Sequence, residues 1–110
     1  MDRDKYTDLD IRVDKDEKAE TYDAWLGRDR VGTLVYQLTA GRVAMISVAV
    51  DREYQHQGVA TELIASALDD VARTGAKVTI GCPAVRSFID EHPEYADVVD
   101  SHHPGVRSRR

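Results

Sequence analysis

The feature that most constrains this chain is a change in the spacing of its apolar residues around Gly58. Before it, the run VAMISVAV (residues 43–50) is apolar at nearly every position, which is typical of a strand covered on both faces. After it, apolar residues recur at helical intervals over residues 59–71, and charged residues occupy the rest of the wheel. The polar stretch EYQHQG separates the two patterns. A buried strand that leads through a glycine loop into an amphipathic helix predicts a mixed α+β fold.

Turn signals divide the first half of the chain into short extended segments. LDIRV (9–13), ETYDAWLG (20–27) and VGTLVYQL (31–38) precede the apolar run, and the last of these alternates apolar and polar residues with strand period. Their connections are charged or glycine-containing and too short for a packed helix. Four consecutive strands with such connections predict an antiparallel meander.

The second half continues with a strand and a helix. Gly75 is a plausible helix cap, and KVTIGC (77–82) reads as a fifth strand that is parallel to the fourth because a helix leads into it. AVRSFIDEH (84–92) predicts a short helix, and Pro93 starts a last turn. We expect one domain over residues 1–100 and a disordered tail over residues 101–110 that is dispensable for folding. The apolar residues expected to dock this end of the chain are Val85, Phe88, Ile89, Tyr95, Val98 and Val99.

Composition excludes several classes of protein. The 110 residues are 42% hydrophobic, which suits one soluble domain with a small core. Fifteen Lys and Arg against twenty Asp and Glu give a net charge of -5, which disfavours nucleic acid as a partner. No apolar run is long enough for a membrane span, and the N-terminus lacks the apolar core of a secretion signal. With a single cysteine, Cys82, the chain cannot form an internal disulfide, and we expect a cytoplasmic location.

Gly58 lies where the predicted strand passes into the long helix. The free N–H groups and the dipole of a helix start favour an anion, and glycine lets a ligand approach the backbone closely. The spacing is that of neither a phosphate-binding Gly-Lys-Ser/Thr loop nor the dinucleotide motif. A phosphate site and a purely structural glycine are the two interpretations that the physics leaves open.

The motif QHQGVA (55–60) resembles the Q/R-x-x-G-x-G/A pyrophosphate loop of GCN5-related N-acetyltransferases, with Ala60 in the final small position. More of the chain, from VAVDREYQHQGVA through CPAVRSFIDEHPEYADVV, resembles the short, single-domain acetyltransferase-like proteins of the YjdJ type. The resemblance covers about the C-terminal two-thirds, and "CP…HPEY" carries most of its specificity. It implies a reduced acetyltransferase fold with an antiparallel four-stranded meander, a long helix, a parallel fifth strand and a short C-terminal helix.

The same resemblance implies a ligand. Acetyl-CoA would be bound as a substrate, without a metal, between the fourth and fifth strands, with its pyrophosphate over residues 55–60 and its pantetheine arm along residues 46–50. The residues expected to contact coenzyme A are Ser47, Val48, Val50, Gln55, His56, Gln57, Gly58, Val59, Ala60 and Thr61.

The acceptor would be an unidentified amine, either of a metabolite or of a protein lysine. Larger relatives place two helices between the first and second strands as a wall of the acceptor site, whereas only residues 14–20 are available here. The acceptor side is therefore expected to be open, or to be completed by a large substrate or by a second copy of the chain in a homodimer.

Catalytic residues are less clearly indicated. Short relatives often carry a histidine in the fourth strand where this chain has Ser47, and serine is a poor general base. Two alternatives to an enzyme therefore remain: a coenzyme A-binding module with little or no turnover, and a protein-interaction domain on the same fold. Cys82 is the candidate catalytic residue: expected at the end of the fifth strand beside the thioester, it is either a transient acetyl carrier or a small buried hydrophobe.

The remaining histidines have structural interpretations. His56 either contacts the ligand or is a solvated loop residue. His92, before Pro93, is expected to satisfy a helix end. His102 and His103 lack the spacing of a metal site, so no metal is expected.

Overall fold

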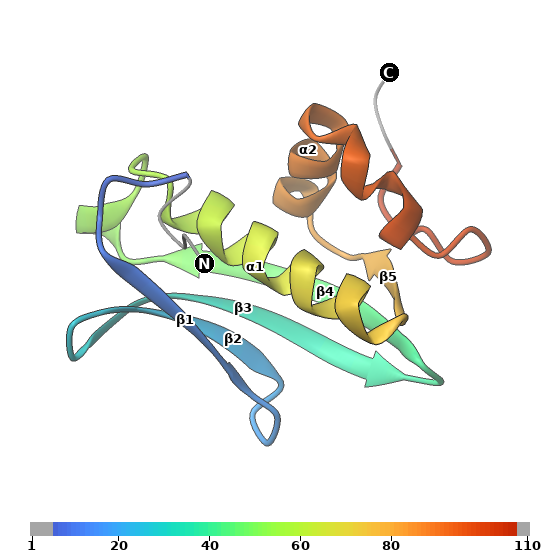
Figure 1. Ribbon diagram of the computed structural model, residues 1–110, viewed down its shortest axis with the longest axis horizontal. Helices are drawn as coiled ribbons and strands as arrows, with labels where there is room; N and C mark the ends of the chain where they lie inside the picture. The colour runs from blue at the N-terminus through green and yellow to red at the C-terminus, as the bar shows by residue number, and fades with distance from the viewer. Residues whose placement is uncertain (1–5, 108–110) are drawn as a thin grey trace.

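The computed structural model describes residues 6–107 and contains one mixed sheet whose five strands follow the order of the sequence. The first four strands are antiparallel neighbours, and β5 is parallel to β4 (Figure 1). This arrangement confirms the α+β fold with a four-stranded meander, a long helix and a parallel fifth strand. The strands are β1 (Ile11–Asp16), β2 (Thr21–Leu26), β3 (Asp29–Thr39), β4 (Arg42–Val50) and β5 (Lys77–Ile80); the helices are α1 (Val59–Thr74) and α2 (Pro83–Glu91), with 3-10 turns η1 (Arg52–Tyr54) and η2 (Pro93–Val98).

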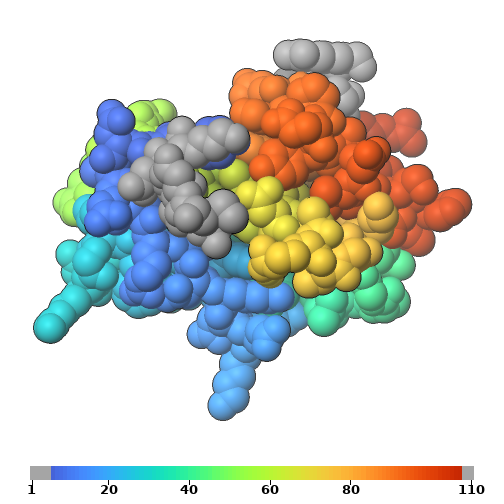
Figure 2. Space-filling view, viewed as in Figure 1, coloured from blue at the N-terminus to red at the C-terminus, as the bar shows by residue number. Residues whose placement is uncertain are grey.

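The core lies between the sheet and α1. In β3 the alternate residues Leu34 and Tyr36 are buried, while Thr33 and Val35 on the opposite face are only half-buried. Helix α1 is buried over much of its circumference because the sheet contacts it on one side and the C-terminal segment on another. The space-filling view shows the orange C-terminal segment against the yellow half of α1 (Figure 2). No helix in the part of the chain that the structure describes is long and apolar enough to cross a membrane.

The connection between β1 and β2 is a tight turn. The two strands pair as far as Asp16 and Thr21, so only residues 17–20 join them. The expectation that no helices fit between the first two strands is confirmed. The side of the sheet where larger relatives would carry these helices is left without them here.

The end of the chain closes the outer edge of β5. The backbone N–H of Ile80 donates to Pro104 O at 2.9 Å, and that of Val106 donates to Ile80 O at 2.7 Å. Upstream, Asp100 N donates to Val78 O at 2.8 Å. The prediction of a disordered tail is therefore wrong for residues 101–107, because the free backbone groups of an edge strand bind a passing segment whatever its side chains. Residues 108–110 lie outside the described residues.

Candidate functional site

Strands β4 and β5 separate part-way along β4. They pair only from Arg42 and Lys77 to Met45 and Ile80, and Gly81 N makes the last link by donating to Met45 O at 2.8 Å. A Cβ added at Gly81 would lie 2.7 Å from Met45 O, so glycine permits this close crossing. The chain then turns into α2, while β4 continues to Val50 with β3 as its only strand neighbour among the described residues. Residues 46–50 of β4 therefore have no partner in β5.

The separation changes the environment of β4. Val43 and Met45 are buried, but Ile46 is 43% exposed and Ser47 is also exposed. The expectation that the apolar run is covered on both faces is therefore wrong: Ala44 is only half-buried, and the exposure is greatest in the half that lies beyond the pairing with β5. At the same point Tyr36 opposes Met45 and Val35 opposes Ser47, so Ile46 is the extra residue of a β-bulge. Bulges increase local twist and redirect neighbouring side chains.

The loop after β4 is braced by its own glutamines. Gln55 Nε2 donates to Val50 O and Gln57 Nε2 donates to Glu53 O, both at 3.0 Å. His56 and Gly58 adopt left-handed backbone conformations, with φ of 64° and 86°. The loop is thus fixed from within, and alternating backbone conformations of this kind can orient successive N–H groups towards one point.

A hollow of about 350 Å³ lies between this loop and the start of α1. Gly58 has no side chain with which to cap the helix, so within residues 6–107 no capping side-chain bond is made at the start of α1, where the first N–H groups have no intrahelical partner. The helix dipole adds positive potential at the same place. Tyr54 was not foreseen, although an aromatic residue directly before a binding loop is a usable signal. The lining residues are Val50, Tyr54, Gln55, His56, Gly58, Val59, Ala60 and Thr61.

The structure brings most of the residues expected to contact coenzyme A to this hollow. Those outside its lining are Ser47, Val48 and Gln57. Ser47 and Val48 lie earlier on β4, beside the separation from β5. Val59 as a whole residue is only 1% exposed, so neither its side chain nor its backbone offers a ligand much surface in this structure.

Gly58 is also needed by the chain itself. A Cβ added there would lie 1.8 Å from Tyr6 O, a severe overlap with a backbone atom. The N-terminal segment therefore occupies one side of the glycine. The structure shows that Gly58 has a packing role, which the alternative of a purely structural glycine anticipated.

The sequence profile of the GCN5-related N-acetyl-transferase family matches residues 21–98, which include the strands β2 to β5, the loop and both helices. The chain belongs to the GCN5-related N-acetyltransferase family. Among curated proteins none matches the chain.

Solved structures of acetyltransferases share the fold. The ribosomal-protein-S18-alanine N-acetyltransferase of Escherichia coli has a TM-score of 0.53 at 18% identity, over 60% of this chain and 43% of its own. A putative acetyltransferase of Desulfovibrio desulfuricans scores 0.50 at 24% identity, over 71% and 52%. An aminoglycoside acetyltransferase from a soil metagenome, in complex with sisomicin, scores 0.50 at 18% identity, over 82% and 62%. The matched part of this chain spans about half the length of these acetyltransferases.

Cys82 lies just beyond the strand that the sequence assigned to it. Strand β5 ends at Ile80, and Cys82 is the extended residue before Pro83, which begins α2. Its side chain is 8% exposed and belongs to the hydrophobic core. Cys82 does not line the hollow at the start of α1. It follows the Gly81 contact with β4, so it lies near the place where the two strands of this acetyltransferase fold part.

The histidines near the C-terminus make hydrogen bonds that stabilise local backbone structure. His92 Nδ1 lies 2.9 Å from Phe88 O at the end of α2, which confirms its interpretation as a helix-end residue. The backbone N–H groups of His102 and His103 donate to Asp100 Oδ1 at 2.8 and 3.0 Å. Within residues 6–107 no group of three or more His, Cys, Asp or Glu side chains is placed to hold a metal ion.

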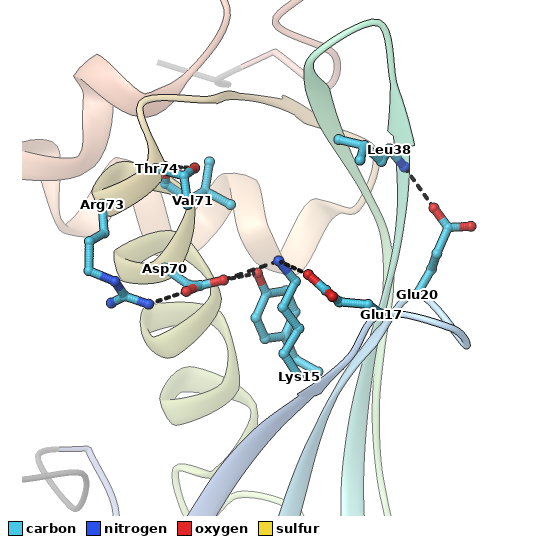
Figure 3. Close-up of polar contacts among 9 residues, drawn as sticks. Lys15, Glu17, Glu20, Leu38, Asp70, Val71, Arg73 and Thr74 are labelled. Carbon is cyan, nitrogen blue, oxygen red and sulfur yellow. Dashed lines mark hydrogen bonds and ion pairs between the residues drawn. The ribbon is translucent and has the colours of Figure 1, made fainter.

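The other half of α1 is held by a polar network. Tyr22 Oη donates to Asp70 Oδ2 at 2.7 Å, and Lys15 Nζ lies 3.4 Å from the same oxygen (Figure 3). Arg73 pairs with the other carboxylate oxygen. Burial and the hydrogen bond to Asp70 raise the pKa of Tyr22. Because these groups satisfy one another across β1, β2 and α1, we assign them a structural role.

Proposed function

We propose that this acetyltransferase-family protein binds acetyl-CoA at the separation of β4 from β5 and transfers the acetyl group to an amine. The observation that carries the proposal is the junction itself. β4 loses its β5 partner after Met45, continues to Val50 and leads through the loop of residues 51–58 to the start of α1 and its hollow. A strand edge without a β5 partner and the N–H groups of a helix start suit the amide-bearing arm and the pyrophosphate of one extended ligand.

In this proposal the pyrophosphate accepts hydrogen bonds from the backbone of residues 58–61. Gln55 and Gln57 contribute indirectly, because their side chains brace the loop rather than point freely at a ligand. The pantetheine arm runs along Ile46–Val50 as an added strand. The thioester would then reach the bulge at Ile46, near Gly81.

The proposed reaction is direct acyl transfer. The amine nitrogen bonds to the thioester carbonyl carbon, and a tetrahedral oxyanion forms that a strand N–H could stabilise. The C–S bond then breaks, the thiolate of coenzyme A takes up a proton, and the amine loses one to a base. Ser47 is exposed but is a poor base, so we assign it no proton transfer. Cys82 as an acetyl carrier stays a prediction that requires its thiol to reach the thioester.

The acceptor side is open because β1 and β2 are joined only by residues 17–20. An open side suits an amine on a large substrate as well as a small molecule. The names of the similar structures suggest two amines to test first: a peptide with an N-terminal alanine, and sisomicin. A peptide containing lysine completes the panel.

Titration with acetyl-CoA by calorimetry tests binding, and release of free thiol with the amine panel tests turnover. Ala60→Glu is the sharpest variant: Ala60 lines the hollow in the first turn of α1, where glutamate suits the helix but would repel phosphates. Ala60→Gln has nearly the same size without the charge. We expect much weaker binding in Ala60→Glu than in Ala60→Gln. No binding by the unmodified protein at millimolar ligand would end the proposal, and binding without turnover on any amine would reduce it to a coenzyme A-binding module.

A further inference from the structure

A short segment before β1 lies against the loop that leads into α1. We call residues 6–7 the N-terminal strap. Tyr6 O makes the close approach to Gly58, and Tyr6 N lies 3.3 Å from Glu62 Oε1 as a donor to that carboxylate. Thr7 is 7% exposed, and its Oγ1 accepts from Leu9 N at 3.1 Å. The backbone N–H of Tyr6 is therefore bonded to the first turns of α1, while its carbonyl lies against Gly58, the residue before the helix.

The Tyr6 ring also ties the strap to α2. It meets Phe88 edge-on, with centroids 5.9 Å apart, and His92 edge-on at 5.7 Å. Phe88 and His92 stack on each other at 4.1 Å. Edge-to-face pairs at these distances are favourable beyond the apolar area that they bury. The strap therefore bridges the start of α1 and the end of α2.

Glu62 is an unusual residue to find buried. Its side chain is 3% exposed in the first turn of α1, although Glu is rarely buried this completely. A buried carboxylate needs hydrogen-bond partners, and the start of a helix is a favourable place for its charge. Its bond to Tyr6 N links the strap to the turn of α1 that carries the N–H groups facing the hollow.

We propose that Glu62 and Tyr6 are positioning residues for the acetyl-CoA site, an inference that rests on the proposed function. By holding the strap against Gly58, they fix the left-handed backbone of that residue and hence the direction of the first N–H groups of α1. A site ordered before the ligand arrives binds more tightly, because binding no longer has to order it. Neither residue needs to touch the ligand.

The test compares two variants that both remove the charge of Glu62. Glu62→Gln keeps an acceptor for Tyr6 N, and Glu62→Met has a similar length without one. We expect acetyl-CoA to bind about fivefold more weakly to Glu62→Met than to Glu62→Gln, the loss that one hydrogen bond would give. The dissociation constants are measured by calorimetry at a temperature where circular dichroism shows each protein to be folded.

Tyr95→Phe is the control for general destabilisation. This variant removes the 2.8 Å hydrogen bond from Tyr95 Oη to Asp69 Oδ1. Asp69 lies in the same helix as Glu62, α1, but far along it from the loop. We expect Tyr95→Phe to lower the melting temperature and leave the affinity unchanged. Tyr6→Ala is the second test should Glu62→Met fail to fold, and we expect it both to weaken binding and to speed amide hydrogen exchange over residues 56–61.

The outcomes separate the two proposals. No binding by the unmodified protein overturns the proposed function and this inference together. Binding by the unmodified protein with equal affinity in both Glu62 variants overturns only the positioning role, as does tighter binding in Glu62→Met or Tyr6→Ala, which would make the strap an obstruction.

Discussion

The two ends of α1 share a backbone geometry and differ in everything around it. Gly58 before the helix and Gly75 after it are both left-handed, with φ and ψ of 86° and 4° at the first and 81° and 1° at the second. A Cβ at Gly75 would meet nothing within 4 Å, whereas at Gly58 it would meet Tyr6 O at 1.8 Å. Position 75 thus requires glycine only for its left-handed backbone. Position 58 requires glycine both for its left-handed backbone and because Tyr6 leaves no room for a side chain.

The surroundings of the two ends of α1 differ in the same way as the two glycines do. The start of α1 adjoins the open part of β4 and the hollow. The last turns are tied to β1 and β2 through Asp70 and lead into β5, whose outer edge the end of the chain closes. One end of the helix adjoins the proposed ligand site, and the other is tied into the fold.

The largest expected effect is that of Gly58→Ala. A left-handed alanine is strained, and its methyl group would also collide with Tyr6 O. We expect the free energy of unfolding to fall by about 3 kcal/mol, measured by urea denaturation. Gly75→Ala is the matched control and should lose about 1 kcal/mol, from conformation alone. Equal losses at the two glycines would contradict the difference drawn between the helix ends.

Next in size is removal of residues 104–110. This deletion takes away the two backbone hydrogen bonds to Ile80 and exposes the edge of β5. We expect a loss of about 2 kcal/mol in unfolding free energy. Deletion of residues 108–110 alone is the control and should change little. A full deletion as stable as the whole chain would restore the view that the tail is dispensable.

Tyr22→Phe should have a smaller effect, of about 1 kcal/mol, because it removes one hydrogen bond to Asp70 from the stabilising half of α1. Burial by itself would raise the pKa of Asp70, but the Tyr22 hydrogen bond and Lys15 lower it overall from its ordinary value of 3.8. A lowered folded-state pKa gives stability that is present above pH 3.8 and lost as the pH falls through the folded-state value.

The pH dependence of unfolding therefore separates this network from simple packing. The acid loss of stability below pH 3.8 should be smaller in Tyr22→Phe than in the unmodified protein. Urea denaturation at a series of pH values gives the comparison. Parallel curves for the two proteins would show that Tyr22 does not act through Asp70.

The smallest expected effect is that of Gly75→Asn. Asparagine tolerates the left-handed region better than other residues with a side chain, and open space surrounds this position. We expect a change of only a few tenths of a kcal/mol, seen as a shift of the thermal midpoint of a degree or two. A loss as large as that in Gly58→Ala would reveal a packing role at Gly75 as well.

The sequence predicted the elements well because their signals are local. Alternation in β3 and the helical spacing from Val59 to Val71 depend on residues that are near in sequence, and both elements lie where expected. The loop at Gly58 was predicted because its residues are consecutive. Seven of the ten residues expected to contact coenzyme A therefore line one hollow.

The errors concern contacts between distant segments. The exposure of Ile46 depends on where β5 turns away, and an apolar run carries no sign of that point. The segment around Gly105 and Val106 docks on Ile80 through backbone hydrogen bonds. Such bonds do not depend on side chains, so the polar sequence of the tail gives no sign of them. The contact between Tyr6 and Gly58 joins the N-terminal segment to the middle of the chain. The local sequence around either residue contains no pattern that predicts this contact.

The measurement that most directly tests the central claim is the map of backbone amide shifts on adding acetyl-CoA, recorded by NMR with the unmodified protein. We predict that the changes gather at Ile46–Val50 and over residues 55–61, while the amide of Gly75 and those of β1 and β2 keep their positions. Unchanged spectra at millimolar ligand would contradict the account. So would changes confined to the larger hollow of about 450 Å³ between α2 and the end of the chain, lined by Pro83, Arg86 and Val106 among others.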